Sequence, residues 1–164
     1  MITGSADVHK AVATLWESSG LNTLFQSYWA AADRSLYVSL NDGEAAPKTP
    51  WPFCVYEASA NVVKTRMSGD GDHSKQHIND QPWRFWVHAA QTATKSAKEM
   101  AADMAAEIMK VFGGHPTQTP SGLTLDNGQV LIVQYQSDYA ERESDMVHKW
   151  TIEYNIRTDV PVAV

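Results

Sequence analysis

The densest group of residues that could do chemistry is the polar segment 67–82, which is rich in aspartate and histidine and nearly free of apolar residues. His73 and His77 stand four positions apart, a spacing that places two imidazoles on one helical face for zinc. Gly71 disfavours a helix here, and the glutamate of a metalloprotease motif is missing. A calcium loop starting at Asp70 also fails, because Lys75 replaces the required glycine. The segment is therefore predicted to be a long solvated hairpin loop that orders against a partner, with the contact residues Asp70, Asp72, His73, Lys75 and His77.

The single cysteine, Cys54, lies in an apolar stretch between Phe53 and Val55. A nucleophilic thiol needs an electropositive, partly open setting and a nearby base. We therefore expect Cys54 to be a buried, inert thiol. A small-molecule or enzymatic pocket would need convergent polar groups, for which the candidates are His88, His148, Tyr154 and Cys54. The spacing of these residues gives no sign that they converge, so we expect no catalytic site, no metal and no cofactor.

Charged residues crowd the segment 138–149, between two apolar stretches near the C-terminus. A solvated turn is one interpretation of this segment. Ion pairs that bridge subunits are the other, and Glu141 and Arg142 are the candidates for such contacts.

The chain is unusually aromatic, with six tryptophans and six tyrosines. Trp83 and Trp86 have opposite parity within one predicted strand, so Trp51, Trp83 and Trp86 cannot all lie on one face of a sheet. Either an aromatic surface that includes Trp51 meets a protein partner, or the first helix covers that face. The sequence leaves both alternatives open.

Composition excludes several classes of protein. The chain has 164 residues, of which 43% are hydrophobic and 20% charged, so neither disorder nor a fibrous repeat is expected for the chain as a whole. The net charge of −6 argues against binding that relies on neutralising phosphates. No apolar run approaches the roughly 20 residues of a membrane span, and the N-terminus lacks the pattern of a signal peptide. We expect a single domain over residues 1–164, with no membrane contact.

Apolar residues repeat at helical spacing over 6–19 and 92–112. Ser5 is the expected N-cap of the first helix, because its hydroxyl can accept from an unpaired backbone N–H. Gly20 is its expected C-terminal stop. The second helix is ended by Gly113 and its neighbours, and at about 1.5 Å per residue it is long enough to cross a small sheet.

Strands are predicted over the segments 35–40, 53–58, 61–67, 82–90, 129–137 and 146–157. The last segment alternates over six pairs, so its even-numbered residues, Trp150 among them, should face the core. At about 3.4 Å per residue it spans roughly 40 Å, long enough to run past its own sheet and pair with a neighbour. The predicted fold is α+β, an antiparallel sheet of four to five strands packed by the long helix, in the order α-β-β-β-α-β-β.

This layout resembles the tail-terminator, or tail-completion, proteins of long-tailed bacteriophages. The resemblance covers about residues 7–158. It is carried by the proline-flanked strand 51–56, the strand 83–89 that leads into the helix 92–112, and the closing strand pair 130–136 and 146–157.

The resemblance implies a structural, non-enzymatic virion protein that forms a hexameric ring on the head-proximal end of the tail tube. Such a ring ends tube polymerisation, contacts the tube protein and a head-closure or connector protein, and lets DNA pass through its lumen without specific binding. One alternative is another phage neck or head–tail connector subunit. The other belongs to a different class, a small-molecule-binding or enzymatic α+β domain.

Overall fold

The computed structural model describes residues 4–59, 62–67, 76–113, 122–126, 129–144 and 146–161. Helix α1 (Gly4–Ser18) is followed by the short helix α2 (Leu21–Gln26). Gly20 lies between them with a φ of 84°, a left-handed conformation that favours glycine, so the predicted stop is confirmed. Ser5 is not the N-cap, because α1 already includes it.

The strands form one sheet in the order β1-β2-β4-β6-β5, with β3 paired to β4 off this path. Their bounds are β1 (Leu40–Asp42), β2 (Phe53–Ala58), β3 (Val62–Met67), β4 (Gln76–Ala90), β5 (Gln129–Arg142) and β6 (Val147–Pro161). The α+β class is confirmed. Six described strands replace the predicted four to five, and the sheet is mixed, because β1 pairs parallel to β2.

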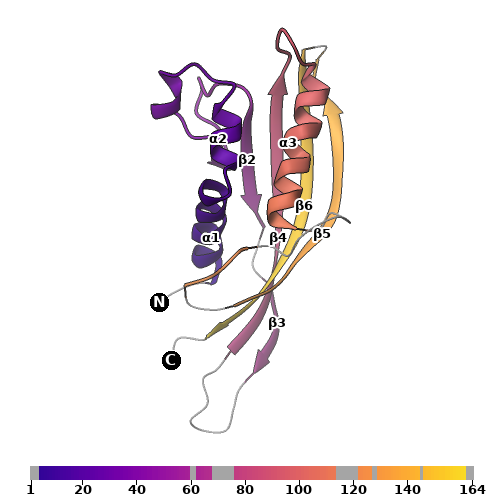
Figure 1. Cartoon of the computed structure of the whole chain (residues 1–164). Coiled ribbons are helices and arrows are strands. Elements are labelled where there is room, and N and C mark those ends of the chain that lie inside the picture. Colours follow the sequence, from indigo (N-terminus) through magenta and orange to yellow (C-terminus); the bar gives the residue numbers. More distant parts are fainter. Residues whose placement is uncertain are drawn as a thin grey trace.

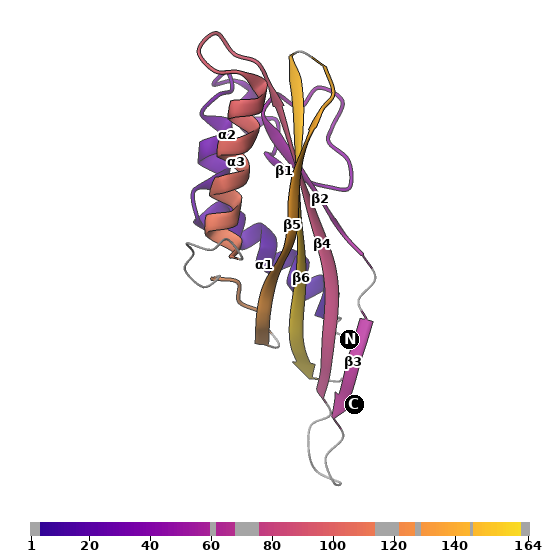
Figure 2. The same cartoon turned by 90° about the vertical axis from the view of Figure 1, so that its right-hand side faces the viewer.

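The three α-helices of the described residues pack on one face of the sheet, which Figure 2 shows from the side. Helix α3 (Ala97–Phe112) crosses β4 and β6, while α1 and α2 lie beside it over β2. The core lies between these layers. Its largest side chains are fully buried and include Trp16, Phe25, Trp83, Phe85, Phe112 and Tyr154. One face of the aromatic-rich strands thus belongs to this core, and the opposite face lies away from the helices.

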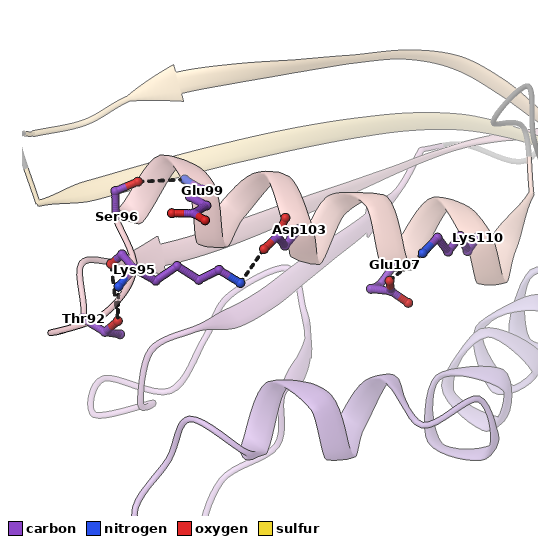
Figure 3. A network of polar contacts seen from close by, with 7 residues as sticks. All are labelled: Thr92, Lys95, Ser96, Glu99, Asp103, Glu107 and Lys110. Atoms are coloured by element: carbon purple, nitrogen blue, oxygen red, sulfur yellow. Dashed lines mark hydrogen bonds and ion pairs between the residues drawn. The ribbon is translucent and has the colours of Figure 1, made fainter.

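Helix α3 begins at Ala97, five residues later than the sequence predicts. The hydroxyl of Ser96 accepts a hydrogen bond from the backbone N–H of Glu99 at 3.2 Å, which makes Ser96 the N-cap (Figure 3). Thr92 instead forms a turn, because its hydroxyl accepts from the backbone N–H of Lys95 at 3.1 Å. The prediction missed the Ser-x-x-Glu capping pattern that this segment contains.

Strand β4 begins at Gln76, so the predicted hairpin loop 67–82 is wrong for its second half. Polar residues here are held in the sheet by specific partners. Arg157 donates from Nε and Nη2 to the two Asp80 carboxylate oxygens at 2.7 and 2.9 Å. The Gln81 amide donates to the Ser59 carbonyl at 3.0 Å and accepts from the Trp83 indole N–H at 3.0 Å. These bonds compensate for the burial of polar groups that sequence reasoning assigns to solvent.

The two C-terminal strands are also longer than predicted. Strand β5 continues through Arg142, so the first part of the charged link is strand, and β6 continues to Pro161. Strand β6 lies inside the sheet between β4 and β5, so it is not the free strand that pairs with a neighbour. Its C-terminal half pairs with the first residues of β4, and with β3 these strands project past the helices as an arm (Figure 1).

The first predicted strand, 35–40, is also wrong. A 3₁₀ turn occupies Asp33–Ser35, and only Leu40–Asp42 pairs with β2. Leu36 and Val38 are left 72% and 61% exposed, because the chain meets the sheet only after them.

The second face of the sheet is partly covered by the segment that precedes β2. Trp29 packs there with Phe53 and Val55, and Trp86 lies against this small cluster. The Trp29 indole N–H donates to the Pro52 carbonyl at 2.9 Å. The alternative that the first helix covers this face is wrong, because the loop partly covers it instead. Trp51 stays 39% exposed, and its contact with a protein partner stays a prediction. Among the described residues, no helix has the length and apolar character needed to cross a membrane.

Candidate assembly surface

The face of the sheet opposite the helices, here called the outer face, carries rows of cross-strand contacts. Alternation along β4 sends Arg84, Trp86 and His88 to this face, while Trp83, Phe85 and Val87 enter the core. The register of β6 places Glu153, Thr151 and Lys149 beside them in turn. The alternation predicted for β6 is therefore confirmed, with Ile152, Tyr154 and Ile156 buried on the helical side.

One row joins Trp51 to Glu141 across four strands. The rings of Phe53 and His88 stack with their centroids 4.8 Å apart. The Trp51 ring is steeply inclined to both, with centroid distances of 5.0 Å to Phe53 and 5.9 Å to His88. Lys149 is the register neighbour of His88 on β6, and its Nζ lies 2.8 Å from the Glu141 carboxylate. Burial lowers the pKa of His88 below its usual 6.5, so the ring is stabilised in its neutral form.

A second row is built on an ion pair. The Arg84 guanidinium Nε lies 3.0 Å from the Glu153 carboxylate, and Ser137 donates to the same carboxylate at 3.1 Å. The Arg84 guanidinium also lies 5.7 Å from the centre of the Trp86 ring, within cation–π range. Acidic, basic and aromatic groups are thus fixed in place before any partner arrives.

Beside this row the outer face is hollowed. The depression has a volume of about 430 Å³, and its lining includes Ser59, Asp80, Arg84, Gln136, Glu153 and Asn155. Apart from Ser59, which directly follows β2, these residues lie on β4, β5 and β6.

Strand β5 forms one lateral edge of the sheet, and no described strand pairs with its free side. Tyr135 donates from its hydroxyl to Asp138, and this hydrogen bond raises the pKa of Tyr135 to about 12. The Trp150 indole N–H donates to the other Asp138 oxygen at 2.8 Å. Asp138 therefore holds two aromatic groups on the helical side of an exposed strand.

A groove of about 520 Å³ separates α2 from α3 on the helical side. Its charged side chains are paired, Lys95 with Asp103 and Lys110 with Glu107, the latter at 2.8 Å (Figure 3). Tyr28 lies at the same groove and is 41% exposed. Each lysine is neutralised by its carboxylate partner, so these four residues add no net charge to the groove.

The structure brings some of the predicted contact residues together and separates others. Trp51, 39% exposed, shares the outer face with Glu141. Arg142 follows Glu141 on β5, so alternation points it to the helical side. His77 belongs to β4, where it pairs with Arg66 and Val160, and its side chain lies outside the described residues. The remaining four, Asp70, Asp72, His73 and Lys75, lie outside the described residues altogether.

The four residues considered for a small-molecule pocket do not converge. His88 faces outward, whereas Cys54 and Tyr154 are buried on the helical side of the sheet. His148 is half-buried near the start of β6, six residues along the strand from Tyr154. Burial raises the pKa of the Cys54 thiol well above its usual value, as expected for an inert thiol. In the described ranges, no group of three or more histidine, cysteine, aspartate or glutamate side chains could hold a metal ion.

The ion pairs of the outer face escaped sequence reasoning. Asp80 and Arg157 are 77 positions apart, and Arg84 and Glu153 are nearly as distant. Alternation in β6 correctly assigned Glu153 and Arg157 to the open face, but only the register with β4 identifies their partners.

No family model matches the chain, and no curated protein matches it. Among solved structures, the chain is similar to a chain described as "Virion of native gene transfer agent (GTA) particle". The two share 15% sequence identity with a TM-score of 0.42, and the match covers 82% of this chain and 89% of the other.

Proposed function

We propose that this chain is a structural virion protein of the tail-terminator type. In this role it assembles into a ring, with six subunits as the expected number, on the head-proximal end of a phage tail tube. The ring ends tube polymerisation and presents the surface that joins the head. Its partners are further copies of itself, the tail tube protein and a head-closure or connector protein, and its role involves no catalysis.

The observation that carries this proposal is the sheet that outgrows its helical cover. Strands β4 and β6 are each 15 residues long, about three times the usual strand length. With β3 they extend as an arm beyond the helices (Figure 1). An isolated domain gains little from such an arm, because the arm lies beyond the helices that cover the rest of the sheet. In an assembly, the same arm can extend from one subunit and contact the next.

The outer face supports the same proposal. It combines pre-arranged ion pairs, such as Arg84 with Glu153, with the partly exposed ring of Trp51. Aromatic and arginine side chains are the types enriched in protein–protein contacts. The net charge of −6 suits a ring whose lumen DNA crosses without sticking, because like charges repel.

The direct test measures tube length. Purified tail tube protein is polymerised with and without this chain, and the tubes are imaged by negative stain. A terminator should give short, uniform tubes with a ring at one end, whereas without it the tubes should grow to irregular lengths. Tubes of unchanged length with no bound ring would refute the proposal.

A second test addresses segment 68–75, which connects β3 to β4 and contains four of the predicted contact residues. Residues 76–81 must be kept, because they belong to β4. Replacing 68–75 by Asn-Gly, a two-residue hairpin turn, should leave the melting temperature nearly unchanged and abolish tube capping. Normal capping by this variant would show that the segment does not contact the tube.

A further inference from the structure

Exposed large apolar side chains gather at two lateral borders of the sheet. At one border, Leu36 and Val38 lie just before the edge strand β1, 72% and 61% exposed. We call segment 36–42 the β1 border. At the other, Ile132 and Tyr139 on β5 and Met146 in the turn after it are 47%, 43% and 61% exposed. We call segment 129–146 the β5 border.

The two borders cannot contact each other within one molecule. Strands β2, β4 and β6 separate them, and at about 4.8 Å between strands the sheet is roughly 19 Å wide. Figure 1 shows the segment after α2 on one side of the sheet and β5 on the other. Apolar surface at two opposed borders of a soluble chain is typical of contacts with other subunits.

Strand direction allows the borders of two copies to join. Strand β1 runs parallel to β2, which is antiparallel to β4, and β4 and β5 are each antiparallel to β6. Strands β1 and β5 therefore run in opposite directions. When the β1 border of one copy meets the β5 border of the next, the two edges are antiparallel, as most pairs in this sheet already are.

Charge disfavours a contact between two β5 borders. Segment 138–143 carries three carboxylates, Asp138, Glu141 and Glu143, against the Arg142 guanidinium. Lys149 of β6 pairs with Glu141, and a net negative charge remains on this border. Two such segments placed edge to edge would bring like charges together, which destabilises strand pairing. The 3₁₀ turn that leads into the β1 border carries one charge of each sign, Asp33 and Arg34, and meets the acidic strand without this repulsion.

We propose that the β1 border of one copy docks on the β5 border of the next copy, with Leu36 and Val38 covering Tyr139, which lies in the same register row as Asn41 of β1. This proposal rests on the proposed function and identifies the contact that closes the ring. The contact is heterologous, since each copy uses two different borders. Such contacts form rings when the rotation between copies closes.

The test uses two variants with one defective border each, V38D and Y139D, and Y28D as a matched control in the α2–α3 groove. Each border variant alone should stay a monomer of 18.2 kDa by light scattering. Their equimolar mixture should form a dimer of about 36 kDa, because one intact β1 border then meets one intact β5 border. The control should assemble as the unaltered chain does, at about 109 kDa for six copies. Circular dichroism confirms that each variant is folded.

Other outcomes overturn the proposal. If V38D or Y139D alone forms a dimer, the contact joins two identical borders. If both variants still form rings, the ring uses another surface, and the proposed function stands without this contact. If the unaltered chain is a monomer in solution, the single variants V38C and Y139C are treated with a short bis-maleimide at high concentration, each alone and both mixed. A linked dimer that forms in the mixture and with neither variant alone supports the docking of unlike borders, and its absence, with Cys54 buried and unreactive, overturns it. Tube capping reports on the proposed function independently.

Discussion

Replacing Thr151 by valine should stabilise the protein. Thr151 lies in the middle of β6, faces the outer side of the sheet and is completely buried between its register neighbours Trp86 and Tyr139. Its hydroxyl has no hydrogen-bond partner among the described residues. Valine has nearly the same shape and the same preference for strands, so the substitution removes an unpaired polar group without opening a cavity.

The expected gain follows from the cost of burying an unpaired hydroxyl. That cost is about 1–3 kcal/mol in protein mutational data, and part of it is regained when a methyl group takes the place of the hydroxyl. We expect the free energy of unfolding to rise by about 1 kcal/mol. For a chain of this size the melting temperature should rise by about 2–4 °C. Urea unfolding and calorimetry on the purified protein measure both quantities.

Ser39→Ala is the matched control, because it removes a hydroxyl that is equally buried but fully used. Ser39 accepts from the Trp16 indole N–H at 2.9 Å and donates to the Asn22 amide oxygen. Its loss leaves buried polar groups unpaired and should cost about 1–3 kcal/mol. The two substitutions should therefore have opposite signs. A clear loss of stability in T151V would refute the reasoning, since the hydroxyl would then have a partner.

Substitutions at four further positions test the core, a cap and the outer face. Phe85→Ala should cost about 3–5 kcal/mol in urea unfolding, because the ring is fully buried against Tyr154 and Phe112, and a cost below 1 kcal/mol would contradict the assigned core. Trp150→Ala should cost less than Phe85→Ala, since Trp150 is only partly buried; an equal or larger cost would contradict this ranking. Ser96→Ala should cost about 1 kcal/mol and Ser96→Asp much less, because aspartate also caps helices; equal losses would argue against the cap. Burial lowers the pKa of His88 in the folded protein, so the folded state disfavours protonation of this ring. The free energy of unfolding is therefore highest above about pH 6.5, where the ring is neutral in both states, and it decreases as the pH falls below that value. His88→Phe, which keeps the stacked ring, should flatten the dependence of stability on pH between about pH 5 and 8 in urea titrations, and an unchanged slope would exclude His88 as its source.

Local patterns in the sequence were sufficient for the elements that depend on near neighbours. The bounds of β2 matched the prediction at both ends, and the stop at Gly20 was recovered because a left-handed residue is a local requirement. The alternation of β6 identified its buried face for the same reason. The Ser96 cap was equally readable from the Ser-x-x-Glu pattern and was missed only because helix-forming residues precede it.

The assembly surface depended on pairings that no local pattern contains. Polarity suggested a loop for residues 76–81, yet β6 pairs with them and Arg157 neutralises Asp80, so the segment is strand. The charges of 138–142 likewise suggested a turn, yet antiparallel pairing with β6 continues the strand.

The sequence by itself determined the α+β class, the apolar faces that form the core and the acidic character of this chain. The net charge follows from composition, and the elements and their apolar faces follow from patterns that repeat over a few residues. The tertiary structure alone decided which strands lie at the edges, which charges pair across the outer face and where apolar side chains remain exposed. These properties arise from contacts between residues as many as 77 positions apart. The register of β4, β5 and β6 sets those contacts, and a shift by one residue would reverse every side chain on the surface.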